Sequence, residues 1–136
     1  MNALTRFVFT IVVSLMAAGM AFAQDGSAPV QHSPGGVEYV NGGIGEGARN
    51  AMAQMSGFDL KLVFSNPAGQ FLVADHVAVK GQSGEVFAVD QAGPWLLLKL
   101  PPGSYTVSAR YAGATQERTV KVGSGMQTLN WRFAAS

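Results

Sequence analysis

Apolar and polar residues alternate along much of the chain after residue 57. Every second position is apolar in residues 58–64 and again in residues 105–111, which is the pattern of a strand with one buried face. Less regular apolar runs predict further strands over residues 71–80, 85–90, 95–100, 115–122 and 127–133. Turn-forming residues separate these runs at the spacing typical of sandwiches and barrels. The pattern therefore predicts an all-β domain, a seven-stranded antiparallel β-sandwich over residues 58–136.

Two apolar runs in residues 93–111, GPWLLLKLPPGSYTVSARY, flank a rigid turn. Pro101 and Pro102 fix two φ angles and withhold two backbone donors, whereas Gly103 is free to take a positive φ. We expect a hairpin here. The run over residues 95–100 barely alternates, which predicts an inner strand that is covered on both faces.

A short amphipathic helix is predicted before the first regular strand. Its apolar stripe has helical spacing and consists of Ile44, Ala48, Met52 and Met55,. Gly57 is well placed to end the helix. We predict a helix over residues 44–55 that caps an open end of the sandwich or lies against a partner. The rest of residues 24–57 is expected to be a flexible N-terminal segment, in which residues 37–40 are a candidate first strand.

The first residues have the features of a signal peptide. Arg6 precedes a mostly apolar stretch without charged residues over residues 7–20, and Ala21-Phe22-Ala23 is a small-x-small cleavage pattern followed by Gln24,. The stretch is shorter than the ~20 residues that cross a bilayer. We expect residues 1–23 to be removed between Ala23 and Gln24, leaving a periplasmic or secreted protein without a stable membrane anchor.

Charge and cysteine content narrow the classes of function. The chain has 9 Lys and Arg against 8 Asp and Glu, and removal of Arg6 with the signal peptide leaves no formal net charge. Because the remaining basic residues are scattered over the predicted elements, no nucleic-acid surface is expected. The chain has no cysteine, so disulfides and thiol chemistry are excluded.

Candidate catalytic and metal-binding residues are few. His32 lies in the N-terminal segment, and the only adjacent pair of ligand types is Asp75 and His76. Neighbouring strand residues point to opposite faces, so this pair is not expected to bind one ion. A triad of His76 with Ser83 and Asp90 could be drawn, but sequence order supplies no geometry for it. We predict no catalytic, metal or cofactor-binding residues.

Two other features bear on binding. The glycine-rich residues 42–47 lack the Lys-Ser/Thr ending of a phosphate loop, and we interpret them as a connection. Trp95 and Trp131 would suit a sugar-stacking platform if they were exposed. Both lie in apolar strand patterns, which favours the core, because tryptophan is highly buried on average.

The hairpin region and the strand after it, Trp95-Leu-Leu-Leu-Lys-Leu-Pro-Pro-Gly-Ser-Tyr-Thr-Val-Ser-Ala-Arg-Tyr-Ala-Gly, resemble the carboxypeptidase regulatory-like, or prealbumin-like, domains. The resemblance covers about residues 58–122 and implies a Greek-key sandwich, as in small secreted bacterial proteins of uncharacterised function. The zinc peptidase unit of that family is absent from the sequence, so no catalytic residue carries over. Transthyretin-like hydrolases are similar in architecture, but they depend on several histidines and a Tyr-Arg-Gly-Ser signature that this sequence lacks.

These observations predict a non-catalytic exported module that acts by binding or structural association in the cell envelope. Its partner would be an envelope protein or a glycan, bound at the loops or at an edge strand. Two alternatives stay open: a carbohydrate-binding module that uses an exposed tryptophan, and a small periplasmic hydrolase that uses His76. The ligand and the oligomeric state do not follow from the sequence.

Overall fold

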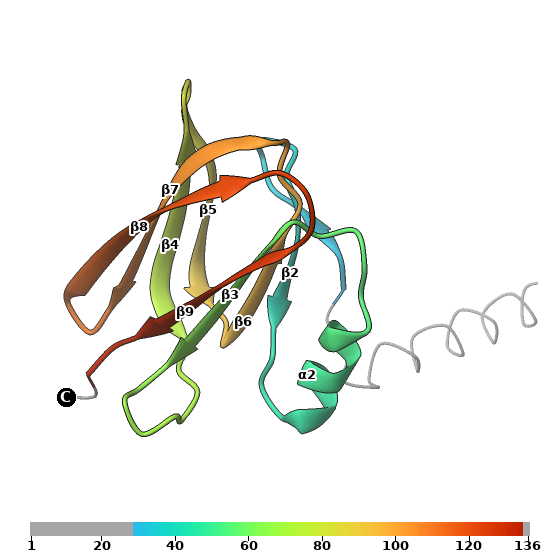
Figure 1. The fold of residues 1–136 in the computed structure, drawn as a ribbon. Coiled ribbons are helices and arrows are strands. Elements are labelled where there is room, and N and C mark those ends of the chain that lie inside the picture. The colour runs from blue at the N-terminus through green and yellow to red at the C-terminus, as the bar shows by residue number, and fades with distance from the viewer. Residues whose placement is uncertain (1–28, 135–136) are drawn as a thin grey trace, which may run out of the picture.

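The computed structural model describes residues 29–134, which form two stacked β-sheets and one helix (Figure 1). These residues contain nine strands. The prediction of an all-β sandwich is confirmed at the level of two sheets. The expected signal peptide and its cleavage site at Ala23 and Gln24 lie outside the described residues.

The first sheet has five strands in the order β1-β2-β6-β3-β9. Their bounds, in that order, are Gln31–His32, Glu38–Gly42, Trp95–Leu98, Leu60–Ser65 and Gln127–Arg132. Strand β6 lies at the centre and pairs with β2 on one side and β3 on the other. Strand β2 overlaps the candidate first strand predicted over residues 37–40, and because it belongs to this sheet, the sandwich extends N-terminally of residue 58.

The second sheet has four strands in the order β5-β4-β7-β8, all antiparallel. Their bounds, in that order, are Gly84–Ala92, Ala74–Gly81, Gly103–Tyr111 and Ala114–Val122. Tight turns join β4 to β5 and β7 to β8. The second turn uses Ala112 and Gly113, both with positive φ (50° and 84°), which is the backbone shape that matches the twist of a two-residue hairpin.

The core lies between the sheets, where alternate residues of each strand meet. Leu60, Leu62 and Phe64 of β3 are fully buried, and the ring of Phe64 stacks on that of Trp131 with centroids 6.1 Å apart. Burying one such side chain stabilises the fold by about 1.5–3 kcal/mol. The period-two pattern of the sequence is therefore the pattern of core contacts.

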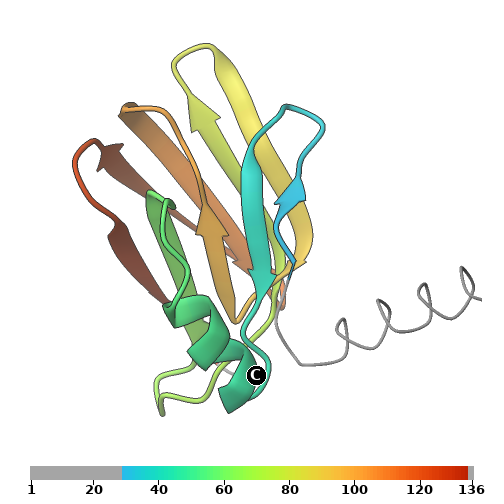
Figure 2. The same cartoon turned by 90° about the vertical axis from the view of Figure 1, so that its right-hand side faces the viewer.

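The expected hairpin over residues 93–111 is not formed. Strand β6 belongs to the first sheet and β7 to the second, so residues 99–102 carry the chain from one sheet to the other (Figure 2). The physical reason is that both sides of β6 are already occupied by β2 and β3. Pro101 and Pro102 also have no N–H with which to continue a ladder.

The prediction of a purely antiparallel sandwich is also wrong at one pair. Strand β9 runs parallel to β3, with Leu60 opposite Gln127 and Ser65 opposite Arg132. The chain leaves β8 in the second sheet and re-enters the first sheet beside β3, in the same direction. A crossover between sheets permits a parallel neighbour, which a hairpin does not.

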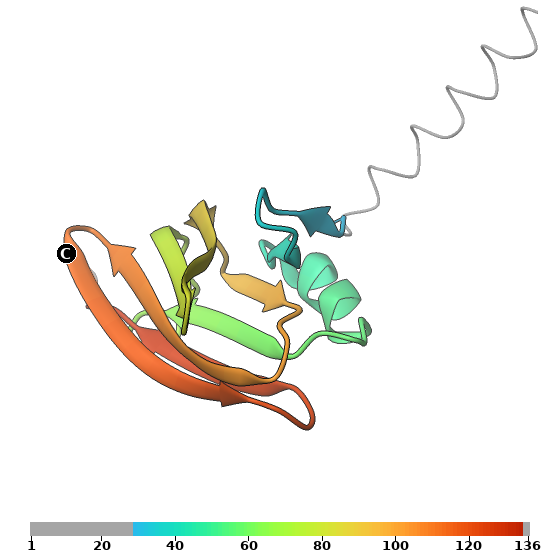
Figure 3. The ribbon, with the colours of Figure 1, turned by 90° about the horizontal axis from the view of Figure 1, so that it is seen from above.

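The helix α2 spans Glu46–Ala53, so it is shorter than predicted. It cannot include Ile44, because Gly45 has a φ of 90°; the side chain of Ile44 is 73% exposed. The helix covers a sheet face instead of an open end. Met52 packs with Val40 and Leu97, which point away from the main core, so β6 is covered on both faces as predicted (Figure 3).

Asn41 ties β2 to the end of β5 and to the connection between β5 and β6. Its Oδ1 accepts a hydrogen bond from the buried Gly93 N–H at 2.8 Å, and its Nδ2 donates to Gln91 O at 3.1 Å. We expect Asn41→Ala to lower the free energy of unfolding by about 1–3 kcal/mol, because a buried donor loses its acceptor. Asn41→Asp keeps the acceptor and should cost less. Urea unfolding of both variants checks this, and equal losses would contradict it.

Candidate functional site

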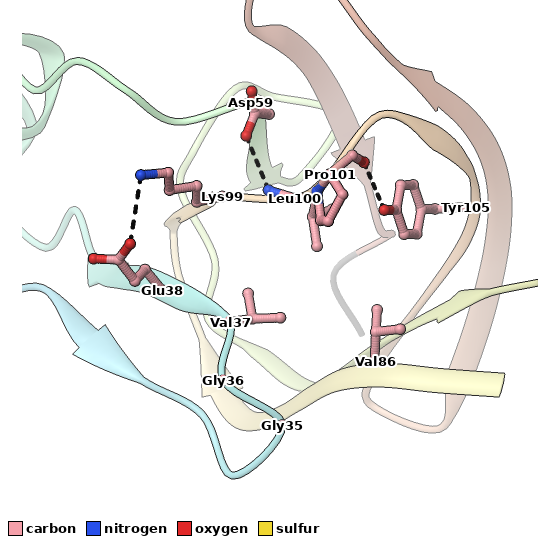
Figure 4. Close-up of a pocket in the computed structure, with 10 residues that line it drawn as sticks. All are labelled: Gly35, Gly36, Val37, Glu38, Asp59, Val86, Lys99, Leu100, Pro101 and Tyr105. Carbon is pink, nitrogen blue, oxygen red and sulfur yellow. Dashed lines mark hydrogen bonds and ion pairs between the residues drawn. The ribbon is translucent and has the colours of Figure 1, made fainter. Parts of the chain in front are cut away.

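A hollow of about 500 Å³ lies at the end of the sandwich where residues 99–102 carry the chain from β6 to β7. It opens between the β1–β2 turn, the β6–β7 connection and β5 (Figure 4). The residues that line it are Gly35, Gly36, Val37, Glu38, Asp59, Val86, Lys99, Leu100, Pro101 and Tyr105. This hollow is the candidate pocket.

The β1–β2 turn forms one wall. Ser33 closes the turn, because its N–H donates to Val37 O (2.9 Å) and its Oγ accepts from Val37 N–H (3.1 Å). Gly36 has a φ of 88°, a conformation that glycine adopts at low cost. At Gly35 a Cβ would lie 3.1 Å from Val86 O, so the absence of a side chain lets the turn approach β5.

The β6–β7 connection forms the opposite wall, and two side chains hold it. The carboxylate of Asp59 accepts a hydrogen bond from Leu100 N–H at 2.9 Å, and the hydroxyl of Tyr105 donates to Pro101 O at 2.6 Å. Tyr105 is only 8% exposed. A connection that contains two prolines is thereby fixed on both flanks.

Ionisable groups meet at the mouth of the pocket. The carboxylate of Glu38 lies 3.5 Å from Lys99 Nζ and 3.6 Å from His32 Nε2. The lining therefore carries two carboxylates and one ammonium group. Across the hollow, Val37 and Val86 face Leu100 and Pro101 (Figure 4). Such a lining suits a ligand that has an apolar surface and hydrogen-bond donors.

Two smaller hollows adjoin the candidate pocket. One of about 270 Å³ lies between the β4–β5 turn and residues 102–105, and one of about 320 Å³ lies between the β1–β2 turn and β5. All three share Val86 as a lining residue. The surface at this end of the sandwich is therefore hollowed on both sides of Val86, beyond the candidate pocket itself.

The residues of the drawn triad do not come together. His76 Nδ1 lies 2.7 Å from Asp90 Oδ1 on the outer face of the second sheet, but Ser83 is in the β4–β5 turn. Five residue pairs of the β4–β5 ladder lie between His76 and the turn. At ~3.3 Å per residue, Ser83 is therefore far beyond hydrogen-bond reach of His76. Asp75 has a different partner, since its carboxylate accepts from Ala112 N–H at 2.8 Å.

Neither tryptophan is an open platform. Trp131 is fully buried. Trp95 is half-buried, and Lys61 Nζ lies 3.5 Å from the centroid of its ring. Desolvation of this ammonium group lowers the pKa of Lys61. The carbohydrate hypothesis requires an exposed tryptophan ring. Trp131 is buried, and the ring of Trp95 is covered by Lys61.

The structure also bears on metals and membranes. Within residues 29–134, no group of three or more His, Cys, Asp or Glu side chains is placed to hold a metal ion. Over the same residues, no helix has the length and apolar character to cross a bilayer.

Sequence reasoning missed the candidate pocket. The prediction of a flexible segment over residues 24–36 leaves out the β1–β2 turn, although Ser33-Pro34-Gly35-Gly36 is a turn signal directly before the apolar Val37 and Tyr39. That signal could have placed a β-turn there. The approach of this turn to β5 depends on tertiary packing, which no local pattern encodes.

The fold and the candidate pocket define a two-sheet β-sandwich with a pocket between connections at one end. No protein-family model matches the chain, and no curated protein or solved structure matches it either.

Proposed function

We propose that this protein is a non-catalytic binding module that holds its ligand in the candidate pocket. The observation that carries the proposal is the pocket itself: its volume of about 500 Å³ falls within the range of small-ligand sites, about 300–1,000 Å³. Apolar walls with a few converging polar groups are also usual in such sites.

The contacts of the polar side chains favour binding over catalysis. Asp59 and Tyr105 hold the β6–β7 connection through backbone groups, and Glu38 is paired with Lys99. These groups give the pocket a fixed shape. A ligand group that donates hydrogen bonds would meet the carboxylates, while its apolar part would pack against Val37 and Val86. An envelope protein segment or a glycan that presents such a group is the proposed partner.

Ligand binding to the candidate pocket can be tested by recording nuclear magnetic resonance spectra of the protein with small fragments. We expect sugars, amines or short peptides from a fragment set to shift the amide signals of residues 35–38 and 99–100 in a saturable way. Lys99→Trp should weaken this binding at least tenfold, because an indole ring would cover the mouth. Lys121→Trp on β8 is the matched control and should leave it unchanged. No saturable shift at the pocket, or equal binding to both variants, would refute the proposal.

We propose that the module is exported, on the strength of the N-terminal sequence. An apolar stretch followed by Ala21-Phe22-Ala23 is the pattern that signal peptidase cleaves,. The working location would be the periplasm or the cell exterior.

If the protein is exported, its signal peptide should be cleaved after Ala23. When the full chain is expressed in a Gram-negative host, N-terminal sequencing of the periplasmic or medium fraction should find Gln24 as the first residue. Ala23→Arg should block processing, since the position before the cut requires a small residue. Recovery of an intact Met1 from the wild-type exported fraction would contradict the proposal.

We also propose kinship with the carboxypeptidase regulatory-like, prealbumin-like domains, with β3 to β9 as the seven strands of a Greek-key sandwich. The apolar strand, the Pro-Pro-Gly connection and the Tyr-x-Val strand over residues 95–111 support it. An experimental structure with strand connections unlike those of that family would argue against this kinship.

A further inference from the structure

The two open sides of the sandwich differ in how their strand edges are protected. On one side β8 lies next to β9, and on the other β5 lies next to the β1–β2 hairpin (Figures 1 and 2). An edge strand presents unpaired N–H and C=O groups and can pair with another chain unless something blocks it. The difference between the two sides therefore decides where a partner strand can add.

The side of β8 and β9 is blocked by side chains. Arg118 Nη1 donates to Asn130 O at 2.6 Å, and Gln116 Nε2 donates to Arg132 O at 2.8 Å. The side chain of Gln127 in turn donates to Lys121 O. Inward-pointing polar residues of this kind are a known protection of sheet edges. A strand that added here would have to break these three bonds.

The edge of β5 carries no comparable protection along its middle. The β1–β2 turn approaches its first half, where a Cβ at Gly35 would lie 3.1 Å from Val86 O, and near its other end Asn41 donates to Gln91 O. Between these contacts, the hydrogen bonds found in residues 29–134 include none from a side chain to the backbone of β5. The inward residues Phe87 and Val89 are apolar, and the ring of Tyr39 packs on Phe87 with centroids 4.9 Å apart.

The charged side chains of β5 itself, Glu85 and Asp90, are both acidic, whereas Lys80 and His76 lie opposite them on β4. Glu85 pairs with Lys80 and Asp90 pairs with His76, with a β-bulge between Val79 and Lys80. Because their partners on β4 are four residues apart, the two carboxylates lie on one face of the sheet, about 13 Å apart at ~3.3 Å per residue of β4. The side chain of Asp90 is 80% exposed. β5 itself contains no basic residue.

From this juxtaposition we propose that the β5 edge is a second binding site, which takes an extended peptide segment by strand addition. The segment would carry Lys or Arg four residues apart, since every second side chain of a strand lies on one face. These basic groups would meet Glu85 and Asp90, and the apolar side chains between them would face Tyr39 and Val89. Backbone hydrogen bonds would supply the affinity, and the charged side chains would determine which peptide binds.

A peptide of sequence TKVTVKT, blocked at both ends, tests this site on the purified protein. We expect it to shift the amide signals of residues 86–91 and to slow the exchange of the β5 amides that face away from β4. Its charge-reversed counterpart, TEVTVET, should bind more weakly. Replacing the central threonine by proline should abolish binding, because the ring removes a ladder donor.

Isosteric variants locate the charge contacts. Glu85→Gln combined with Asp90→Asn should weaken TKVTVKT about 2- to 30-fold at low salt, the range expected for two exposed ion pairs. Glu117→Gln on β8 should have no effect. Lys99→Trp should have none either, which separates this site from the candidate pocket. Shifts on β8 or β9, equal affinity for the charge-reversed peptide, or no binding at millimolar concentration would overturn the proposal.

Discussion

Strand β6 is the element on which the rest of the structure depends. It is hydrogen-bonded along both edges, to β2 and to β3, and it is covered on both faces. Leu96 and Leu98 lie in the main core, while Leu97 packs under α2 with Val40 and Met52. Because both edges are occupied, the chain after β6 has to leave the sheet, and it does so through two prolines. The connection that results is one wall of the candidate pocket.

The pocket and the β5 edge are separate consequences of this arrangement. The N-terminal strands β1 and β2 complete the first sheet beside β6, and their turn reaches across to β5 at Gly35. The turn forms the second wall of the pocket and covers only one end of the β5 edge. On the opposite side the chain closes the sandwich with Gln116 and Arg118. The proposed binding sites therefore both lie on the side of the N-terminal hairpin.

Local patterns in the sequence predicted the strands well and their partners poorly. The alternation in residues 58–64 and 105–111 reflects burial against the other sheet, which acts on each strand by itself. Whether residues 95–100 pair with residues 105–111 depends on competition from β2 and β3 for the same edges, and a local pattern does not record that competition. Ile44 fits a helical stripe by spacing, but the backbone at Gly45 excludes it from the helix.

The candidate site was even less accessible to sequence reasoning. Its polar residues, Glu38, Asp59 and Lys99, come from three separate parts of the chain, and none belongs to a recognisable motif. His76 and the tryptophans attracted attention because of their residue types. Trp131 proved to be core, and His76 proved to lie in a cross-strand pair with Asp90.

Amide hydrogen exchange on the free protein measures the difference between β6 and β5 most directly. We predict that the amides of Leu96, Leu97 and Leu98 exchange only through global unfolding, because β6 is paired along both edges and covered on both faces. The amides of β5 that face away from β4 should exchange orders of magnitude faster, through local fluctuation. Protection of the whole of β5 at the level of β6, or rapid exchange along β6, would contradict the central role of β6 and the open edge of β5.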